Sequence, residues 1–183
     1  MGRPECREGR FKWWCLSRYA SDYLHEYNKP KIVYQVIATY QQFAFTREPF
    51  VSNDKTWIIP DPPPGLLGIL NSKIAWFFLD QIAPKLQGGA FELRSPYISQ
   101  IPIVSPTREL IAKVNEIQAL CDRGERDSPA VTALEKDIDD IVVKMYGLSK
   151  EEEHVIDEAL EACGNRFPRG PVELVSDDED DNE

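Results

Sequence analysis

The chain has 183 residues, 42% of them hydrophobic and 10% aromatic, with a formal net charge of −10. This length allows one domain with a real core, or one domain with an appendage, and the composition is that of a globular protein. The apolar run LLGILNSKIAWFFLD at 66–80 is too short and too polar at its centre to cross a bilayer, which needs about 20 mostly apolar residues.

Cysteine usage and the N-terminal sequence bear on the compartment. The N-terminal segment lacks the charged, apolar and small-residue order of a signal peptide, which favours an intracellular, cytoplasmic chain. The four cysteines form no C-x-x-C pair, and only His25 and His154 could join them as ligands. We therefore expect no metal site and four reduced thiols, at Cys6, Cys15, Cys121 and Cys163. The early start of structured-looking sequence suggests a piece of a larger protein.

Charge is distributed unevenly along the chain. Residues 1–110 hold 13 Lys and Arg against 10 Asp and Glu, a net charge of +3, whereas residues 111–183 hold 8 against 21, a net charge of −13. A mildly basic front and a strongly acidic back suggest two different roles. Nucleic-acid binding depends on the local field, so the acidic average does not exclude it.

The first predicted elements are strands. Alternating β-branched and aromatic residues predict a strand over 31–40, a second over 41–46, and a hairpin over 50–60 that turns at Ser52-Asn53-Asp54. The segment before them, 1–28, contains the basic and aromatic cluster GRFKWWCLSRY. That cluster could stack on bases, or it could anchor an ordinary amphipathic segment onto the core.

A proline-rich connector and a buried helix follow. Four prolines in PDPPPG at 60–65 exclude a sheet ladder, so we expect a loop. Residues 65–83 predict a helix buried on several sides, especially at Leu67, Leu70, Trp76, Phe77 and Leu79. Within it, Asn71-Ser72-Lys73 marks either a polar notch or a break between two helical pieces. AFEL at 90–93 predicts a short strand, and Ser95-Pro96 opens a helical turn.

The remaining structure is expected to be helical. Ser105 and Pro106 predict a helix start that leads to Gly124, and Ser128-Pro129 predicts a second helix that ends at Gly147. Ser149 with Glu152 forms a capping box for a third helix, which ends near 163–164. Together these elements predict an α+β fold: a small twisted mixed sheet, formed by about residues 31–60 plus 90–94, packed on the buried 65–83 helix and followed by a helical appendage.

The order of these motifs resembles a known family. KPKIVYQVIATYQQFAF, LLGILNSKIAWFFL, GGAFELRSPYISQIPIV and SPTRELIAKVNEIQAL occur in this order over residues 28–160. The arrangement resembles the TaqI-like C-terminal specificity domain of adenine-specific DNA methyltransferases, including type IIG restriction–modification enzymes. The target recognition domains of type I specificity subunits are similar in the same places.

The resemblance implies a role and a division of the chain. The family's catalytic motifs lie in an adjoining methyltransferase domain and are absent here, so this chain would recognise double-stranded DNA without modifying it. No cofactor is expected in this chain, and S-adenosylmethionine would belong to the adjoining domain. The division is a connecting segment at 1–30, a target recognition domain at 31–104, a spacer-like helical region at 105–163 and an acidic, disordered tail at 164–183.

Candidate DNA-contacting residues follow from side-chain chemistry. Glutamine amides suit adenine, arginine suits guanine, and lysine and arginine suit phosphates. Residues of these types at predicted strand ends and loops are Gln41, Gln42, Arg47, Lys55, Gln87 and Arg94. Any one of them could equally be a solvated polar residue, and we expect two or three of the set to touch DNA.

Two other function classes remain open. An enzyme in its own right would need clustered catalytic groups, yet Asp61, Glu92 and His25 form no carboxylate pair, triad or metal-ligand spacing. A protein-interaction or structural module would dock a partner through the acidic helices of 105–163. The second alternative is compatible with DNA recognition.

Overall fold

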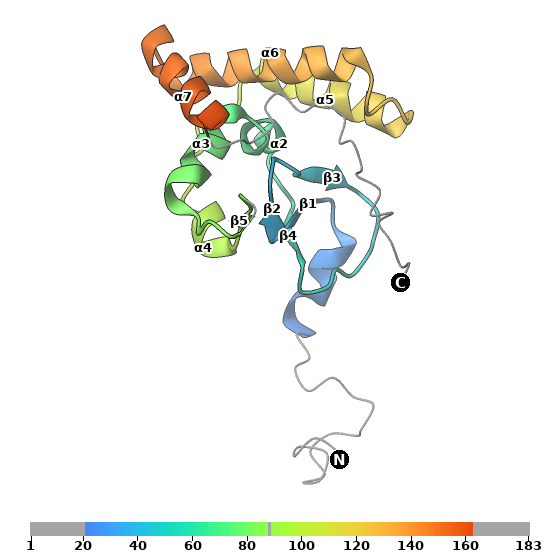
Figure 1. Cartoon of the computed structure of the whole chain (residues 1–183). Coiled ribbons are helices and arrows are strands. Elements are labelled where there is room, and N and C mark those ends of the chain that lie inside the picture. The colour runs from blue at the N-terminus through green and yellow to red at the C-terminus, as the bar shows by residue number, and fades with distance from the viewer. Residues whose placement is uncertain (1–20, 88, 163–183) are drawn as a thin grey trace, which may run out of the picture.

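The computed structural model describes residues 21–87 and 89–162. Figure 1 shows three layers, with long helices at the top, shorter helices in the middle and the strands beneath them. The combination of helices with a small sheet confirms the predicted α+β class. The connecting segment as far as residue 20, the predicted end of the third helix near 163–164 and the acidic tail lie outside the described residues.

The strands form two small sheets. The first has the order β3-β1-β4, with β1 at Lys31–Gln35, β3 at Ala44–Thr46 and β4 at Thr56–Pro60. The second pairs β2, Ile37–Ala38, with β5, Phe91–Glu92. Every pairing among these strands is antiparallel, so the predicted mixed sheet, and the inclusion of 90–94 in the first sheet, are wrong. A bend at Val36 divides the expected long strand and sends β2 to a new partner.

The predicted hairpin at 50–60 does not form. Its second arm is β4, but β4 pairs with β1 along its whole length, from Lys31 opposite Pro60 to Gln35 opposite Thr56. Pro60 is tolerated because β4 is an edge strand and the missing N–H faces away from the ladder. The turn itself is real, since the Asn53 side chain accepts a hydrogen bond from the backbone of Lys55 at 2.9 Å.

The apolar run forms the middle layer as two helices, α2 at Leu66–Leu70 and α3 at Lys73–Ile82. Leu70, Trp76 and Leu79 are buried as predicted, whereas Leu67 and Phe77 are only partly buried. One face packs on Ile32, Tyr34 and Phe91 of the strands, and the other packs on the long helices through Ile69. This double burial explains why the run is apolar on more than one side.

The polar interruption in that run joins α2 and α3 to the rest of the fold. The amide of Asn71 accepts from the backbone N–H of Phe43 at 3.2 Å and donates to its carbonyl at 2.8 Å. Ser72 caps α3 by accepting from Ala75 and donates to the carbonyl of Ile69 at 2.7 Å. The Lys73 backbone N–H donates to Asp139 at 2.8 Å. We call Asn71-Ser72-Lys73 the helix joint.

The top layer consists of α5 at Arg108–Asp122 and α6 at Pro129–Tyr146, with α7 at Lys150–Ala162 beside α3. The predicted Ser128 cap, the end at Gly147 and the Ser149–Glu152 capping box are confirmed. The predicted Ser105 start is wrong, because Thr107 is the N-cap of α5 and accepts from the backbone N–H of Leu110.

Two glycines let the middle layer approach the top layer closely. A Cβ at Gly68 would lie 2.7 Å from the Val114 side chain, and one at Gly65 would lie 2.6 Å from that of Pro106. Any larger residue would push α2 away from α5. The short helix α4 at Ser95–Ile98 and the 3-10 helix η1 at Ser21–Asn28 complete the described elements; η1 lies next to β4.

Candidate nucleic-acid interface

The six residues predicted to contact DNA do not gather at one place. Arg47 follows β3 at the Lys31 end of the three-stranded sheet, and its guanidinium lies 4.8 Å from the Phe45 ring centre. Lys55 precedes β4 at the opposite end, about 20 Å away from Arg47 along the strands. Gln42 is half-buried before β3, and Gln87 is exposed in the turn that follows Lys85.

Gln41 requires a correction. Its side chain is fully buried, with 0% exposure, and neither amide atom has a hydrogen-bond partner. The segment after β2 turns inward here, towards Phe43, whose backbone is held by Asn71. A side chain in this position does not reach a base edge, so Gln41 leaves the set of predicted DNA-contacting residues.

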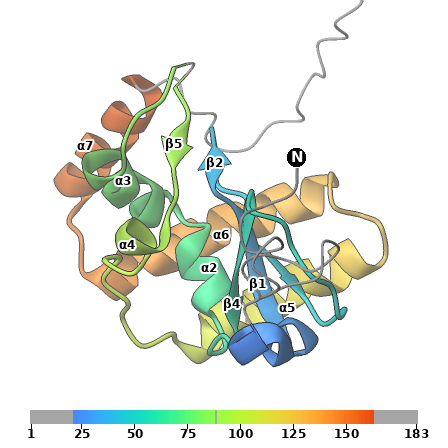
Figure 2. The same ribbon diagram turned by 90° about the horizontal axis from the view of Figure 1, so that it is seen from below.

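Lys55 and Arg94 are brought together by the bend at Val36. The Val36 N–H donates to the carbonyl of Lys55 at 2.9 Å, and its carbonyl accepts from the N–H of Leu93 at 2.6 Å. One peptide position therefore joins the start of β4 to the end of β5. Figure 2 shows β2 and β5 beside β1 and β4 on the side of the molecule away from α5 and α6.

A hollow of about 280 Å³ lies beside this bend. Its lining comes from three segments: the end of β1, the start of β2, and the turn that leads into β4. The lining residues are Gln35, Ile37, Asn53, Lys55 and Thr56. The Lys55 side chain is 73% exposed, and its ammonium is 3.8 Å from the carboxylate of Asp54, which is 84% exposed; this contact is too solvated to neutralise Lys55.

Arg94 borders the same face. Ile37 pairs directly with Glu92 across the β2–β5 ladder, so their side chains emerge on the same side, roughly 5 Å apart. Glu92 accepts from the Nε and Nη2 atoms of Arg94 at 2.8 and 2.6 Å. The guanidinium is thereby oriented, yet remains 58% exposed. We call the five lining residues together with Glu92 and Arg94 the junction surface.

Most of the junction surface was not predicted from the sequence. Lys55 and Arg94 were named as candidates, but Gln35, Ile37, Asn53 and Thr56 were not. One signal was present in KIVYQ: the strand alternation places Gln35 on the face opposite to Ile32 and Tyr34, which are the buried pair. The approach of β2 and β5 depends on the bend at Val36, for which the sequence carries no turn residue.

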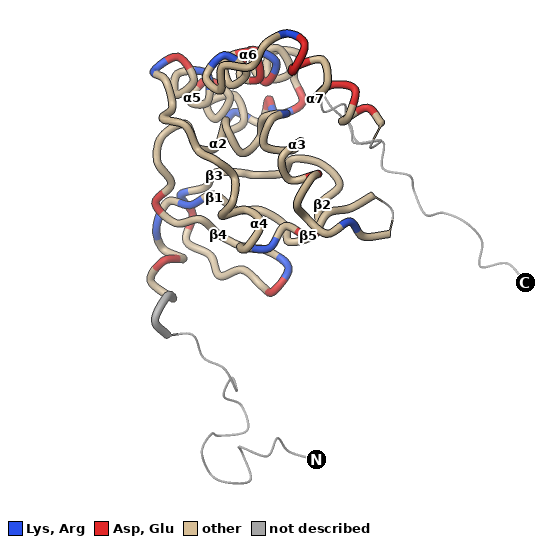
Figure 3. The backbone as a smooth tube through the Cα atoms, turned by 90° about the vertical axis from the view of Figure 1, so that its left-hand side faces the viewer, with Lys and Arg blue, Asp and Glu red and all other residues tan. Residues whose placement is uncertain are grey.

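The charge of the molecule is segregated between layers. Residues 31–104 hold six Lys and Arg against five Asp and Glu, a net charge of +1. The helices at 108–162 hold seven against fifteen, a net charge of −8. Figure 3 shows the acidic residues concentrated along α5, α6 and α7, away from β4, β5 and α4. A polyanion would be repelled by the helical layer and tolerated at the strands.

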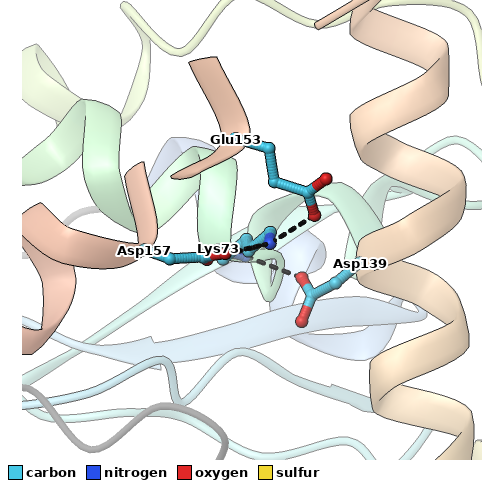
Figure 4. Close-up of polar contacts among 4 residues, drawn as sticks. All are labelled: Lys73, Asp139, Glu153 and Asp157. Carbon is cyan, nitrogen blue, oxygen red and sulfur yellow. Dashed lines mark hydrogen bonds and ion pairs between the residues drawn. The ribbon is translucent and has the colours of Figure 1, made fainter. Parts of the chain in front are cut away.

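The clustered charges at Lys73 are structural. The Lys73 side chain is only 8% exposed, and its ammonium lies 2.6 Å from Glu153 and 2.9 Å from Asp157, while Asp139 accepts from its backbone N–H (Figure 4). Burial alone would lower the pKa of Lys73, but the hydrogen bonds to Glu153 and Asp157 raise it above its ordinary value. A lysine held charged by two carboxylates is a poor nucleophile or base, so this cluster fastens α3 to α6 and α7.

Within residues 21–87 and 89–162, no three His, Cys, Asp or Glu side chains are grouped so as to hold a metal ion. In the same part of the chain, no helix combines the length and apolar character needed to span a membrane. Cys121 is a free, exposed thiol, and the other three cysteines lie outside the described residues.

Comparison with known families identifies the class. The TaqI-like C-terminal specificity domain matches residues 10–103, about half of the chain, and the chain belongs to this family. It is thus a DNA specificity domain of the kind found in restriction–modification enzymes, where the family implies DNA recognition within a larger enzyme. No curated protein matches the chain. The match covers the strands and the middle layer and ends before α5, whereas the resemblance found in the sequence extended to residue 160.

Proposed function

We propose that this chain is the non-catalytic target recognition domain of a larger adenine-specific DNA methyltransferase or restriction–modification enzyme of the type IIG kind. The observation that carries the proposal is the position of the junction surface. Every residue of that surface lies within the span matched by the specificity-domain family. It also carries two exposed cations, and Figure 3 shows that the strands which bear it lie apart from the acidic helices.

Double-stranded DNA suits this arrangement physically. Lys55 lines the hollow and Arg94 is oriented by Glu92 near it, and both side chains retain exposed charge for phosphates. The polar side chains that line the hollow offer donors and acceptors for base edges. The methyl transfer, with S-adenosylmethionine, would occur on a flipped base in the adjoining domain.

The helices α5, α6 and α7 suit a spacer role. Their net charge of −8 disfavours contact with DNA, and the Lys73 cluster fixes their direction relative to the strands. A spacer of this kind would hold the recognition domain at a set distance from its methyltransferase domain. The same acidic helices could dock a partner protein, which is the alternative role left by the sequence.

Selection from a pool of random-sequence duplexes tests the proposal. The full chain, at low ionic strength where phosphate contacts are strongest, is expected to enrich a defined sequence. Incubation with DNA, Mg²⁺ and S-adenosylmethionine is expected to give neither cleavage nor methylation by this chain alone. Recovery of an unenriched pool would overturn the DNA-recognition role, and methylation would overturn its non-catalytic character.

A further inference from the structure

The side-chain amide of Gln35 is exposed and has no partner among the described residues. Gln35 ends β1, is exposed at the rim of the hollow, and pairs with Thr56 across the ladder. Among the described residues its side chain makes no hydrogen bond. The amide therefore has one acceptor and two donors available, and a glutamine amide pairs with adenine by donating to N7 and accepting from N6.

Asn53 lines the same hollow but is occupied. Its side-chain oxygen accepts from the backbone N–H of Lys55 at 2.9 Å, which shapes the turn before β4. The bidentate adenine contact needs both the oxygen and the nitrogen of one amide. The Asn53 oxygen keeps a second lone pair, but its bond to Lys55 fixes the orientation of the Asn53 amide within the turn. Asn53 is therefore a positioning residue that holds the Lys55 turn, and the Gln35 amide, which no such bond fixes, can turn towards a base.

Ile37 supplies an apolar counterpart beside Gln35. It is 46% exposed, although it belongs to β2 and its neighbours Val36 and Ala38 are buried. The major-groove edge of an A·T pair runs from adenine N7 and N6, through thymine O4, to the thymine methyl group, so a surface that contacts the adenine can also contact the methyl group of the same pair. Contact with that methyl group would remove apolar surface of Ile37 from water.

We propose that the junction surface recognises an A·T base pair in the major groove, with Gln35 on the adenine and Ile37 on the thymine methyl. Lys55 and Arg94 flank the pair and neutralise phosphates on either side. This inference rests on the proposed function, because it assigns a base to a surface already proposed to bind DNA. It makes Gln35 and Ile37 specificity-determining residues.

Base analogues test the contacts without altering the protein. In the duplex enriched by the full chain, adenine at each A·T position is replaced in turn by 7-deazaadenine, which lacks the N7 acceptor, and thymine by uracil, which lacks the methyl group. At one position we expect the deaza substitution to weaken binding about tenfold to a hundredfold and the uracil substitution about fourfold.

Matched variants assign those losses to residues. Gln35→Ala, which removes both hydrogen bonds to the adenine, should bind the unmodified duplex at least as weakly as the wild-type chain binds the 7-deazaadenine duplex. This variant should show no further loss of affinity when the adenine is replaced by 7-deazaadenine. Ile37→Ala should bind the unmodified duplex about as weakly as the wild-type chain binds the uracil duplex, and uracil should not weaken its binding further. The control variant Gln118→Ala, on α5, should still bind the 7-deazaadenine duplex and the uracil duplex more weakly than the unmodified duplex. Melting curves establish that each variant is folded.

The outcomes separate the two proposals. If the chain enriches a sequence but Gln35→Ala retains the full deaza penalty, the assignment of Gln35 is wrong and DNA recognition stands. The base assignment also fails if the enriched sequence contains no A·T pair sensitive to either analogue. If the wild-type chain enriches no sequence, both the proposed function and this inference fall.

Discussion

The helix joint and the junction surface are both polar patches beside a largely apolar core, but their partners differ. At the joint, Asn71, Ser72 and Lys73 direct their polar groups to other parts of the fold: the segment before β3, the cap of α3, and α6 with α7. At the junction surface, Gln35 has no partner among the described residues, and Lys55 has only a solvated contact. Polar groups satisfied internally organise a fold, and exposed, unsatisfied groups remain available for a ligand.

The core beneath the joint should show the largest effect on stability. Trp76 is fully buried and meets Phe91 edge to face at 4.9 Å between ring centres. Trp76→Ala should lower the free energy of unfolding by roughly 3–5 kcal/mol, as measured by urea denaturation. Phe77→Ala, one position on but partly exposed, should lose clearly less. Equal losses would contradict the burial of the middle layer.

A change at Gly68 probes the contact between the middle and top layers. The added methyl of Gly68→Ala would lie 2.7 Å from Val114, so α2 and α5 must separate or repack. We expect a loss of about 1–3 kcal/mol in the free energy of unfolding, which exceeds the gain in helix propensity of up to about 1 kcal/mol. Asn115→Ala, on the exposed side of α5, is the control and should leave stability nearly unchanged. Stabilisation by Gly68→Ala would contradict the close packing.

The Lys73 cluster should contribute less, because its carboxylates are partly solvated. Lys73→Met removes the cation but keeps much of the length of the side chain. We expect it to lower the free energy of unfolding by about 1–2 kcal/mol near neutral pH, which is less than for a fully buried pair because the two carboxylates are partly exposed. Thermal or urea unfolding measures it. The exposed Lys113–Asp137 pair between α5 and α6 offers a control, since Lys113→Met should change stability little.

The same cluster predicts a pH dependence. Because the pKa of Lys73 is raised in the folded chain, its contribution is complete below the ordinary value of 10.5 and is lost as pH rises through the folded value. Burial also raises the pKa of Tyr34 to about 12, and ionisation of Tyr34 would destabilise the fold over the same range. In a Tyr34→Phe background, wild-type Lys73 should therefore lose stability above pH 10.5, and Lys73→Met should lose less. Parallel curves would contradict the role of the cluster.

The sequence predicted the positions of helices and strands better than it predicted which strands pair with each other. Local signals placed the Ser128 and Ser149 starts correctly, because a cap is made by residues a few positions away. The hairpin at 50–60 failed because β4 pairs with β1, which lies far away along the chain. The long helix at 65–83 was divided at Asn71-Ser72, an alternative that the sequence had left open.

The candidate site was predicted only in part for the same reason. Lys55 and Arg94 could be chosen by residue type, but their proximity depends on the two hydrogen bonds of Val36, which link segments that no local pattern connects. The Gln41 amide has the donor and acceptor that an adenine contact needs, but the chain buries it, so it cannot reach a base. Gln42, Arg47 and Gln87 stay predictions, away from the junction surface.

The salt dependence of DNA binding tests the central claim most directly. The affinity of the full chain for its enriched duplex is measured over a range of salt concentrations, for wild type, for the double variant Lys55→Ala with Arg94→Ala, and for Lys136→Ala on α6. If the junction surface holds the phosphates, the double variant should bind more weakly and lose about two units of salt slope, while Lys136→Ala should match wild type. Stability should change by less than about 0.5 kcal/mol in each. An unchanged slope in the folded double variant would contradict the assignment of this surface to DNA.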